Sequence, residues 1–153
     1  MKMFLYSASL LLVITVAFFA LIYWQNSQVP VLGVLDGQFK PLKNSPNGVS
    51  TQATDTSKRV APWPWKSDSA TTMKAIQASV QSLGNARIVQ QESNYLYAVF
   101  TTPTMKFHDD VEFWLEASDK TVQFRSQSRA GKSDLGLNQQ RYQQLEAQYL
   151  THD

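Results

Sequence analysis

The chain has 153 residues, 43% of them hydrophobic and 17% charged, a composition typical of one globular domain with additional segments. Its formal net charge is +2 and it has no basic cluster of the kind that nucleic-acid binding needs, so no nucleic-acid partner is expected. The chain has no cysteine, which excludes disulfides, thiolate catalysis, cysteine-ligated zinc and a lipid-modified cysteine.

The chain begins with an uncharged, apolar stretch over residues 3–24 that ends in two aromatic residues. As a helix it would span the roughly 30 Å hydrocarbon core of a bilayer, and its terminal aromatic rings favour the interface. Lys2 precedes it and the next charged residue is Asp36, which predicts a cytoplasmic N-terminus. We expect residues 1–24 to be a transmembrane anchor, in contact with the lipid bilayer through residues 3–24, that holds a periplasmic domain on a bacterial inner membrane.

A cleaved signal peptide is the main alternative to an anchor. Small residues stand at Ala17 and Ala20, as they do before a cleavage site. The apolar core of a signal peptide is usually about 7–15 residues long, so the length of this stretch favours the anchor. A buried core helix is disfavoured because the stretch is hydrophobic on all sides. Secretion after cleavage and a thylakoid membrane stay open as alternative locations.

Residues 25–68 have the composition of a linker and extended segment, because they hold all but one of the six prolines and many Ser, Thr, Asn and Gly residues. Residues 45–50 have strong turn chemistry. Trp63 and Trp65 are unusual in a linker, since tryptophan side chains are costly to leave in water. We expect both to dock on the folded domain, with the membrane interface as the alternative.

Residues 69–153 have the patterns of an α+β globular domain. The predicted elements, in chain order, are a helix over residues 69–83, strands over 87–92, 95–101, 110–116 and 121–128, and a helix over 138–150. Ser69 or Thr71 is predicted to cap the first helix and Asn138 the second. This order predicts a four-stranded antiparallel sheet flanked by two helices.

The last two strands allow a prediction of register. With a four-residue loop between them, Glu116 faces Thr121, Leu115 faces Val122, Phe113 faces Phe124 and Glu112 faces Arg125. The apolar couples then share one face, while Glu112 and Arg125 meet on the other, where opposite charges across a ladder are favourable. A slip of one residue would put every side chain on the wrong face.

Polar side chains are concentrated between residues 124 and 141, where the last strand leads to the last helix. They combine fork-shaped donors with short polar groups: Arg125, Ser126, Ser128, Arg129, Asp134, Asn138 and Arg141. Three carboxylates upstream complete the candidate set: Asp109, Asp110 and Glu112. The arginines can bind a carboxylate or phosphate ligand, or the nearby carboxylates can pair with them internally. The nearly matched charges favour internal pairing, with one arginine left free at the edge as a mixed outcome.

No catalytic residue, metal ligand or cofactor is predicted. In a strand, Asp109 points to one side and Asp110 and Glu112 to the other, so these carboxylates do not converge. His108 is the only histidine of the domain away from the tail, which is too few for a typical zinc site. The serines near residue 126 lack the elbow motif of a nucleophile, and their pairing with His108 is disfavoured.

Three segments resemble motifs of a known family. The spacing of polar residues over 125–141 resembles the signature of domain-of-unknown-function family 1499, and residues 107–113 are similar to a second marked segment. Residues 45–50 resemble its N-terminal motif, which usually has cysteine where this chain has Gly48. The resemblance covers about residues 42–150. It implies a bacterial envelope protein with a lipoprotein signal or membrane anchor, or a plastid relative, and it implies no activity.

Two functions are compatible with these observations. The first is a noncatalytic envelope module that binds lipid, cell-wall material or another envelope protein. The second is an enzyme or small-anion binder that uses the arginines and carboxylates over residues 125–141. Guanidinium groups that face a cleft with fewer carboxylates than arginines would favour the second function, and a network with every arginine paired would favour the first.

Overall fold

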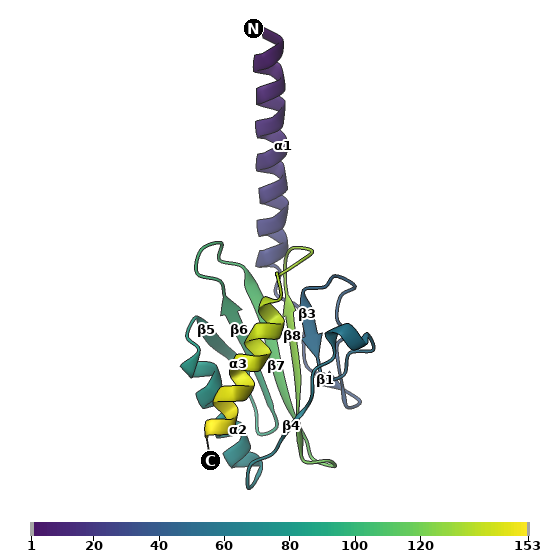
Figure 1. Cartoon of the computed structure of the whole chain (residues 1–153), viewed down its shortest axis with the longest axis vertical. Helices are drawn as coiled ribbons and strands as arrows, with labels where there is room; N and C mark the ends of the chain where they lie inside the picture. The colour runs from purple at the N-terminus through teal and green to yellow at the C-terminus, as the bar shows by residue number, and fades with distance from the viewer. Residues whose placement is uncertain (1, 153) are drawn as a thin grey trace.

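The computed structural model describes residues 2–152, with side chains from residue 6 onward. A long N-terminal helix projects from a mixed α+β domain that contains a sheet and two further helices (Figure 1). In chain order the elements are α1 (Lys2–Ser27), β1 (Val34–Leu35), β2 (Gln38–Phe39), β3 (Gly48–Ser50), the 3-10 helix η1 (Thr56–Lys58), β4 (Trp63–Pro64), α2 (Ser69–Ser82), β5 (Ala86–Gln91), β6 (Tyr95–Thr101), β7 (His108–Glu116), β8 (Thr121–Ser128) and α3 (Leu137–Thr151).

Six strands form one antiparallel sheet, in the order β3-β8-β7-β6-β5, with β4 also paired to β8. β1 and β2 form a separate two-stranded sheet. The predicted number of four strands is therefore wrong, because β3 and β4 come from residues 25–68. These strands have 3 and 2 residues, too few for an alternating pattern in the sequence. They form against the edge of β8, whose backbone N–H and C=O groups would otherwise be unpaired.

The β7–β8 hairpin has the predicted register. Glu112 lies opposite Arg125 and Phe113 lies opposite Phe124, and the other two predicted couples are also observed. Phe113 and Phe124 are fully buried against the helices, whereas Glu112 and Arg125 meet on the opposite side. We call the face that packs against α2 and α3 the inner face, and the opposite face the outer face.

The main hydrophobic core lies between the inner face and the helices α2 and α3, which cover the same side of the sheet (Figure 1). Trp63 is at its centre, 1% exposed, with its ring stacked on that of Tyr149 at 5.0 Å. The Trp65 Nε1–H donates to the carbonyl of Thr121 at 2.9 Å. The prediction that both tryptophans dock on the domain is confirmed.

The residue that caps α2 precedes both predicted candidates. Asp68 is the N-cap, and its carboxylate accepts a hydrogen bond from the backbone N–H of Thr71 at 2.8 Å. The helix starts at Ser69, the first of the two predicted caps, and Leu83 is its C-cap. Aspartate offers a short side-chain acceptor as serine and threonine do, so each of these neighbouring residues could serve as the cap. The apolar pattern therefore located the helix but did not identify its N-cap residue.

A second, smaller hydrophobic cluster lies on the outer face. Its buried members are Phe39, Tyr95, Tyr97 and Val99, and Leu32, Val34 and Trp114 pack against it. The chain between α1 and β3 therefore covers part of the outer face, with the β1–β2 hairpin as its middle.

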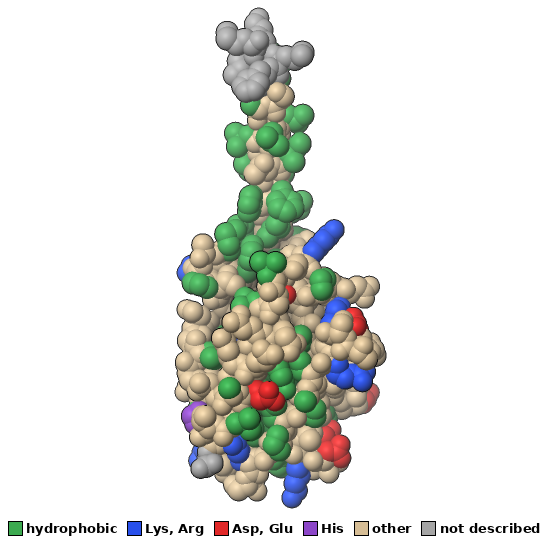
Figure 2. Space-filling view, in the orientation of Figure 1, with side chains coloured by type: hydrophobic (Ala, Val, Ile, Leu, Met, Phe, Trp, Pro, Cys, Tyr) green, Lys and Arg blue, Asp and Glu red, His purple; other side chains and the backbone are tan. Residues whose placement is uncertain are grey.

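Helix α1 is the one described helix that is long and apolar enough to cross a membrane, by length and composition. The apolar window of the span over Tyr6–Ser27 has no buried residue, although Asn26 near the end of the span is buried, and hydrophobic side chains cover much of the helix face seen in Figure 2. A signal sequence near an N-terminus can meet the same criteria of length and composition. The flanking Lys2 side chain lies outside the described side chains.

Candidate functional site

Strand β8 divides the candidate polar residues between the two faces of the sheet. Ser126 and Ser128 point to the inner face, where both hydrogen-bond Asn138 of α3. Arg125 and Arg129 point to the outer face, where each pairs with a carboxylate of β7. The candidate residues are therefore two separate clusters, because successive side chains of a strand point to opposite faces.

Asn138 is the centre of the inner cluster and is 1% exposed. Its Oδ1 accepts from the hydroxyl of Ser126 and from Nη1 of Arg141, the latter at 3.0 Å. Its Nδ2 donates to Ser128 Oγ at 2.9 Å and to Asp134 Oδ2 at 2.7 Å. A buried amide with both of its groups bonded in this way holds α3 against β8.

Asp134 satisfies the start of α3, so the prediction that Asn138 caps this helix is wrong. The Asp134 carboxylate accepts from the backbone N–H of Gly136 at 3.1 Å and from that of Asn138 at 2.8 Å. Gly136 is at the N-cap position with φ 82°, a left-handed conformation that glycine adopts readily. The Asn138 side chain is turned into the domain instead, where the buried serines need a partner.

Arg141 closes the inner cluster with a buried ion pair. Its Nη2 donates to Asp109 Oδ2 at 2.7 Å, and the two side chains are 7% and 2% exposed. The guanidinium carbon also lies 4.8 Å from the centre of the Phe100 ring, a position in which a cation is attracted to the ring face. The predicted divergence of Asp109 from Asp110 is confirmed, since Asp109 serves the inner face and Asp110 the outer.

Asn47 is a buried member of the inner cluster that the sequence did not indicate, because an Asn before a Gly reads as a turn. It is 0% exposed, and its Nδ2 donates to the carbonyl of Gly131 at 2.7 Å. Its Oδ1 accepts from Gln127 Nε2 at 2.6 Å, and its backbone carbonyl accepts from the N–H of Ser128 at 3.0 Å. Asn47 therefore bonds the turn over residues 45–50 to the end of β8 and to the loop that follows it.

Gly48 has no room for a side chain. A Cβ at this position would lie 2.9 Å from the carbonyl oxygen of Ser126 and 2.9 Å from Gln127 Cδ. A residue with a side chain, cysteine included, would not fit here without displacing β8. Glycine therefore lets β3 approach β8 closely enough for the Asn47 hydrogen bonds.

Glu112 organises the first half of the outer cluster and is 0% exposed. Its Oε2 accepts from Arg125 Nη1 at 2.9 Å, and its Oε1 accepts from the Tyr95 hydroxyl at 2.8 Å and from the Gly33 N–H at 3.0 Å. Burial raises the pKa of Glu112, although Arg125 and the other donors oppose the shift. Arg125 Nε also donates to the carbonyl of Lys40 at 2.8 Å, so the segment that covers the outer face is bonded to this ion pair.

Asp110 and Arg129 form the second half of the outer cluster. Arg129 Nε and Nη2 donate to the two carboxylate oxygens at 3.0 Å and 2.7 Å, a bidentate geometry. The Tyr97 hydroxyl also donates to Asp110 and accepts from Arg129 Nη2 at 3.1 Å. Burial, helped by the bond to Asp110, raises the pKa of Tyr97 to about 12. Burial alone would lower the pKa of Arg129, but the contacts with Asp110 raise it.

Each candidate arginine therefore has one carboxylate partner. Arg125 pairs with Glu112, Arg129 with Asp110 and Arg141 with Asp109, and these six side chains are at most 7% exposed. None of the three is left without a carboxylate at the edge of the network. This is the internally paired arrangement, split over two faces.

His108 does not join the serines. Its Nδ1 lies 3.0 Å from the Thr101 hydroxyl, and burial together with the charge of Arg129 lowers its pKa. Within residues 2–152, no group of three or more His, Cys, Asp or Glu side chains is placed to hold a metal ion.

A recess opens on the outer face where α1 ends. Its volume is about 250 Å³. Its polar lining includes Gln25, Gln28, Lys40, Lys43, Asp110, Arg125 and Arg129, and we call it the basic recess. Lys43 Nζ donates to the carbonyl of Arg129 at 2.7 Å, and burial, with the charges of Arg125 and Lys40, lowers the pKa of Lys43. Four cationic side chains and one carboxylate thus line this recess.

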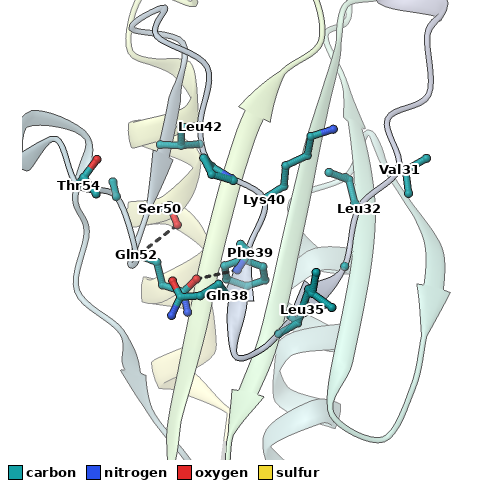
Figure 3. Close-up of a pocket in the computed structure, with 14 residues that line it drawn as sticks. Val31, Leu32, Leu35, Gln38, Phe39, Lys40, Leu42, Ser50, Gln52 and Thr54 are labelled. Carbon is teal, nitrogen blue, oxygen red and sulfur yellow. Dashed lines mark hydrogen bonds between the residues drawn. The ribbon is translucent and has the colours of Figure 1, made fainter.

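A larger apolar groove adjoins the basic recess. Its volume is about 680 Å³. Its apolar wall, drawn in Figure 3, includes Val31, Leu32, Leu35, Phe39, Pro41 and Leu42. We call it the apolar groove. The two hollows share Leu32, Lys40 and Pro41 in their walls.

The sequence did not indicate Lys40, Lys43 or the groove, because all of them belong to residues 25–68, which have no regular pattern. Gln127 was missed for a different reason. It shares the parity of Arg125 and Arg129 along β8 and lines the basic recess with them. Strict alternation applied to residues 125–129 would have found it and separated both arginines from the serines.

No curated protein and no solved structure matches this chain. One protein-family model does match, over residues 38–148, and its description is "Protein of unknown function (DUF1499)". The matched range contains both polar clusters, as the resemblance of the three motifs indicated. The chain therefore belongs to the DUF1499 family.

Proposed function

We propose that the protein is a membrane-anchored, noncatalytic binding module of the bacterial envelope. In this proposal α1 spans the inner membrane with the N-terminus in the cytoplasm, and the α+β domain lies in the periplasm. The observation that carries it is the combination of an apolar helix, whose apolar window is not buried in the domain, with a last turn that is bonded to the domain.

The docking of α1 holds the domain in a defined position at the end of the span. Asn26, 5% exposed, accepts from the His108 N–H at 2.7 Å and donates to the carbonyl of Lys106 at 2.9 Å. The Tyr23 hydroxyl donates to the carbonyl of Met105 at 3.2 Å. Tyrosine at the end of a span suits the membrane interface, where its ring is apolar and its hydroxyl is wet.

Two loops of the domain would then face the membrane surface. Leu135 is 97% exposed and Met105 is 37% exposed, and both line one shallow hollow between the loops that follow β6 and β8. Exposed apolar side chains at the tip of a loop are unfavourable in water and favourable among lipid headgroups. Their position beside the end of α1 supports a domain that rests on the bilayer.

The paired arginines support binding over catalysis. Every candidate arginine is held by a carboxylate, and Asp134 is engaged at the start of α3. A second candidate, a binder of small anions, is favoured by one observation, the excess of cationic side chains around the basic recess. Because the polar residues lie on two faces of the sheet, an anion in the basic recess could contact Arg125 and Arg129 but not Arg141, which lies on the inner face.

Membrane retention tests the proposal. The full chain should sediment with membranes and resist extraction at alkaline pH, and mass spectrometry should find residues 1–20 still attached. In spheroplasts, protease added outside should digest the domain while the intact outer membrane protects it in whole cells. A soluble product that begins after Ala20, or a domain protected in spheroplasts, would refute the anchor or its orientation.

A further inference from the structure

We propose that the basic recess and the apolar groove are one binding site for an anionic lipid, with the phosphate headgroup in the recess and an acyl chain in the groove. The inference rests on the proposed function, because the membrane that holds α1 would supply the lipid. To the proposed function, this inference adds the chemical class of the ligand and the surface of the domain that binds it.

The two hollows are continuous and of opposite character. Leu32, Lys40 and Pro41 line both of them. In Figure 3 the Lys40 side chain extends away from Leu35 and Phe39, toward the side on which α1 ends. A ligand that fills both hollows must therefore be polar at the end nearer α1 and apolar along the groove, which is the description of an amphiphile.

The charge of the recess selects an anion. Within the part of the chain that the structure describes, the Lys40 ammonium group forms no hydrogen bond or ion pair. Its positive charge contributes to the lowered pKa of Lys43. Two like charges placed close together repel each other, and an anion between them relieves the repulsion. A phosphate would supply that anion and would accept hydrogen bonds from both ammonium groups.

The two arginines also retain donors for a ligand. Arg125 Nη2 and Arg129 Nη1 take part in no hydrogen bond with the described residues, while their other nitrogens hold Glu112 and Asp110. Two side-chain nitrogens among residues 6–152 are fully buried without a hydrogen-bond partner, Trp63 Nε1 and His152 Nε2. The two arginine nitrogens are not among them. These donors are therefore not fully buried, and a guanidinium fixed by a carboxylate offers its remaining N–H groups in a preset direction.

The groove suits hydrocarbon because most of its wall is apolar and two of its polar side chains, Ser50 and Gln52, are already hydrogen-bonded within the domain. Gln52 Oε1 accepts from the Phe39 N–H at 2.8 Å and Gln52 Nε2 donates to the carbonyl of Gly37 at 2.9 Å. The Ser50 hydroxyl donates to the carbonyl of Phe124 at 3.0 Å. At the rim, Leu35 is 77% exposed, and covering it with an acyl chain would remove apolar surface from water.

The test uses the purified full chain in a nonionic detergent, with bound lipid counted by native mass spectrometry. Three probes test the headgroup and the acyl chain separately. Lysophosphatidylglycerol is anionic and has one acyl chain, lysophosphatidylcholine has one acyl chain but no net charge, and glycerol phosphate is anionic but has no acyl chain. We expect lysophosphatidylglycerol to bind at least about tenfold more tightly than either other probe, since a charge-assisted contact and the buried chain each contribute on this scale.

Two variants and one control address the residues. Lys40→Gln should weaken binding of lysophosphatidylglycerol about tenfold and reduce the preference over lysophosphatidylcholine. Leu35→Ser should weaken binding of both lysolipids and leave glycerol phosphate unaffected. Both positions have exposed side chains, so the fold should be retained, which circular dichroism checks. Lys74→Gln is the matched control, because Lys74 is an exposed lysine of α2, remote from both hollows.

Equal binding of the two lysolipids, or Lys40→Gln that binds as the unchanged chain does, would overturn the headgroup site. Glycerol phosphate bound as tightly as lysophosphatidylglycerol would overturn the chain site. The result is separable from that of membrane retention. A retained protein that binds no lipid refutes this inference alone, whereas selective lipid binding by a cleaved, soluble protein refutes the anchor alone.

Discussion

Glu112 and Arg125 lie directly opposite each other on β7 and β8, and their side chains meet 2.9 Å apart with exposures of 0% and 5%. The pair is bonded further by Tyr95 and by the backbone of Gly33 and Lys40. It therefore joins two strands of the sheet to the segment that covers them, and removal of either charge leaves the other buried without its partner.

Substitution of one member of this pair should be strongly destabilising. We expect Arg125→Ala to lower the free energy of unfolding by about 3–5 kcal/mol, because it leaves the Glu112 carboxylate buried and unpaired. The double variant Glu112→Leu with Arg125→Met should lose less, since it removes both charges and keeps similar volume. Denaturant titration of the unchanged chain, Arg125→Ala and the double variant compares the three free energies of unfolding, and a double variant less stable than Arg125→Ala would contradict the argument.

Arg129→Ala tests whether the second outer pair is structural. Its side chain is 7% exposed and binds Asp110 through two nitrogens, so we expect a loss of about 3–5 kcal/mol in the free energy of unfolding. Arg129→Lys keeps the charge without the fork geometry and should recover only part of this loss. An unchanged melting temperature together with a lost cellular phenotype would instead identify Arg129 as a ligand-binding residue.

The stability of the domain should fall at alkaline pH. The pKa of Tyr97 is raised from 10.0 to about 12, so between these values the unfolded chain has lost the phenol proton while the folded chain keeps it. The folded state then binds more protons than the unfolded state, and its stability decreases as pH rises, by up to about 1.4 kcal/mol per pH unit for this group.

Tyr97→Phe should flatten that decrease. Denaturation at several pH values from 9 to 11, with tyrosinate absorbance as a second signal, measures the slope. Tyr142, whose pKa burial also raises to about 12, should contribute a similar slope that remains in the variant. A Tyr97→Phe protein with the same pH dependence as the unchanged chain would show that this phenol does not carry the effect.

Trp63 should be essential to the fold although it lies outside residues 69–153. Its ring contacts Phe113, Phe124 and Tyr142 at 5.6–5.9 Å between centres, besides the stacked ring of Tyr149. We expect Trp63→Ala to cost about 3–5 kcal/mol. Trp65→Ala, at a half-buried position, is the comparison and should cost less. A chain that starts at residue 69 lacks β3, β4 and this ring, and should fail to give a cooperative thermal transition.

Asn138 and Asp134 should differ in cost although both serve the start of α3. Asp134→Ala removes an acceptor of backbone N–H groups at the helix start and should cost about 1 kcal/mol. Asn138→Ala leaves buried groups of Ser126 and Ser128 without their partner and should cost more, since each unsatisfied group costs about 1–3 kcal/mol. Thermal unfolding of the two variants gives the order, and a more severe loss in Asp134→Ala would reverse our assignment of roles.

The parts of the fold that the sequence predicted are those with a long, regular pattern. β6 and β8 have the predicted bounds, and the β7–β8 register follows from matching apolar and charged couples across a short loop. β3 and β4 have no such pattern, because their pairing is decided by the free edge of β8, which forms only when the sheet does. The local sequence therefore predicted too few strands, and the missing ones lie in the segment that also supplies Lys40 and the apolar groove.

The candidate residues were identified more successfully than their arrangement. All three arginines do meet carboxylates, but their density along the chain suggested one site where the sheet makes two. Asn138 shows the same limit, since its place at a helix start fits a cap, and only the buried serines across from it explain why it turns inward. A contact between residues far apart in sequence decided each of these outcomes.

The bond between Asn26 and β7 has a mechanical consequence. Asn26 bonds the main chain on both sides of Phe107, so a displacement of the end of α1 would be transmitted to the start of β7. The same strand carries Asp109, Asp110 and Glu112, the acceptors of all three buried arginines. In the membrane-spanning arrangement that we propose, a tilt of α1, as occurs when a bilayer thins or thickens, would therefore turn the strand on which both polar clusters depend.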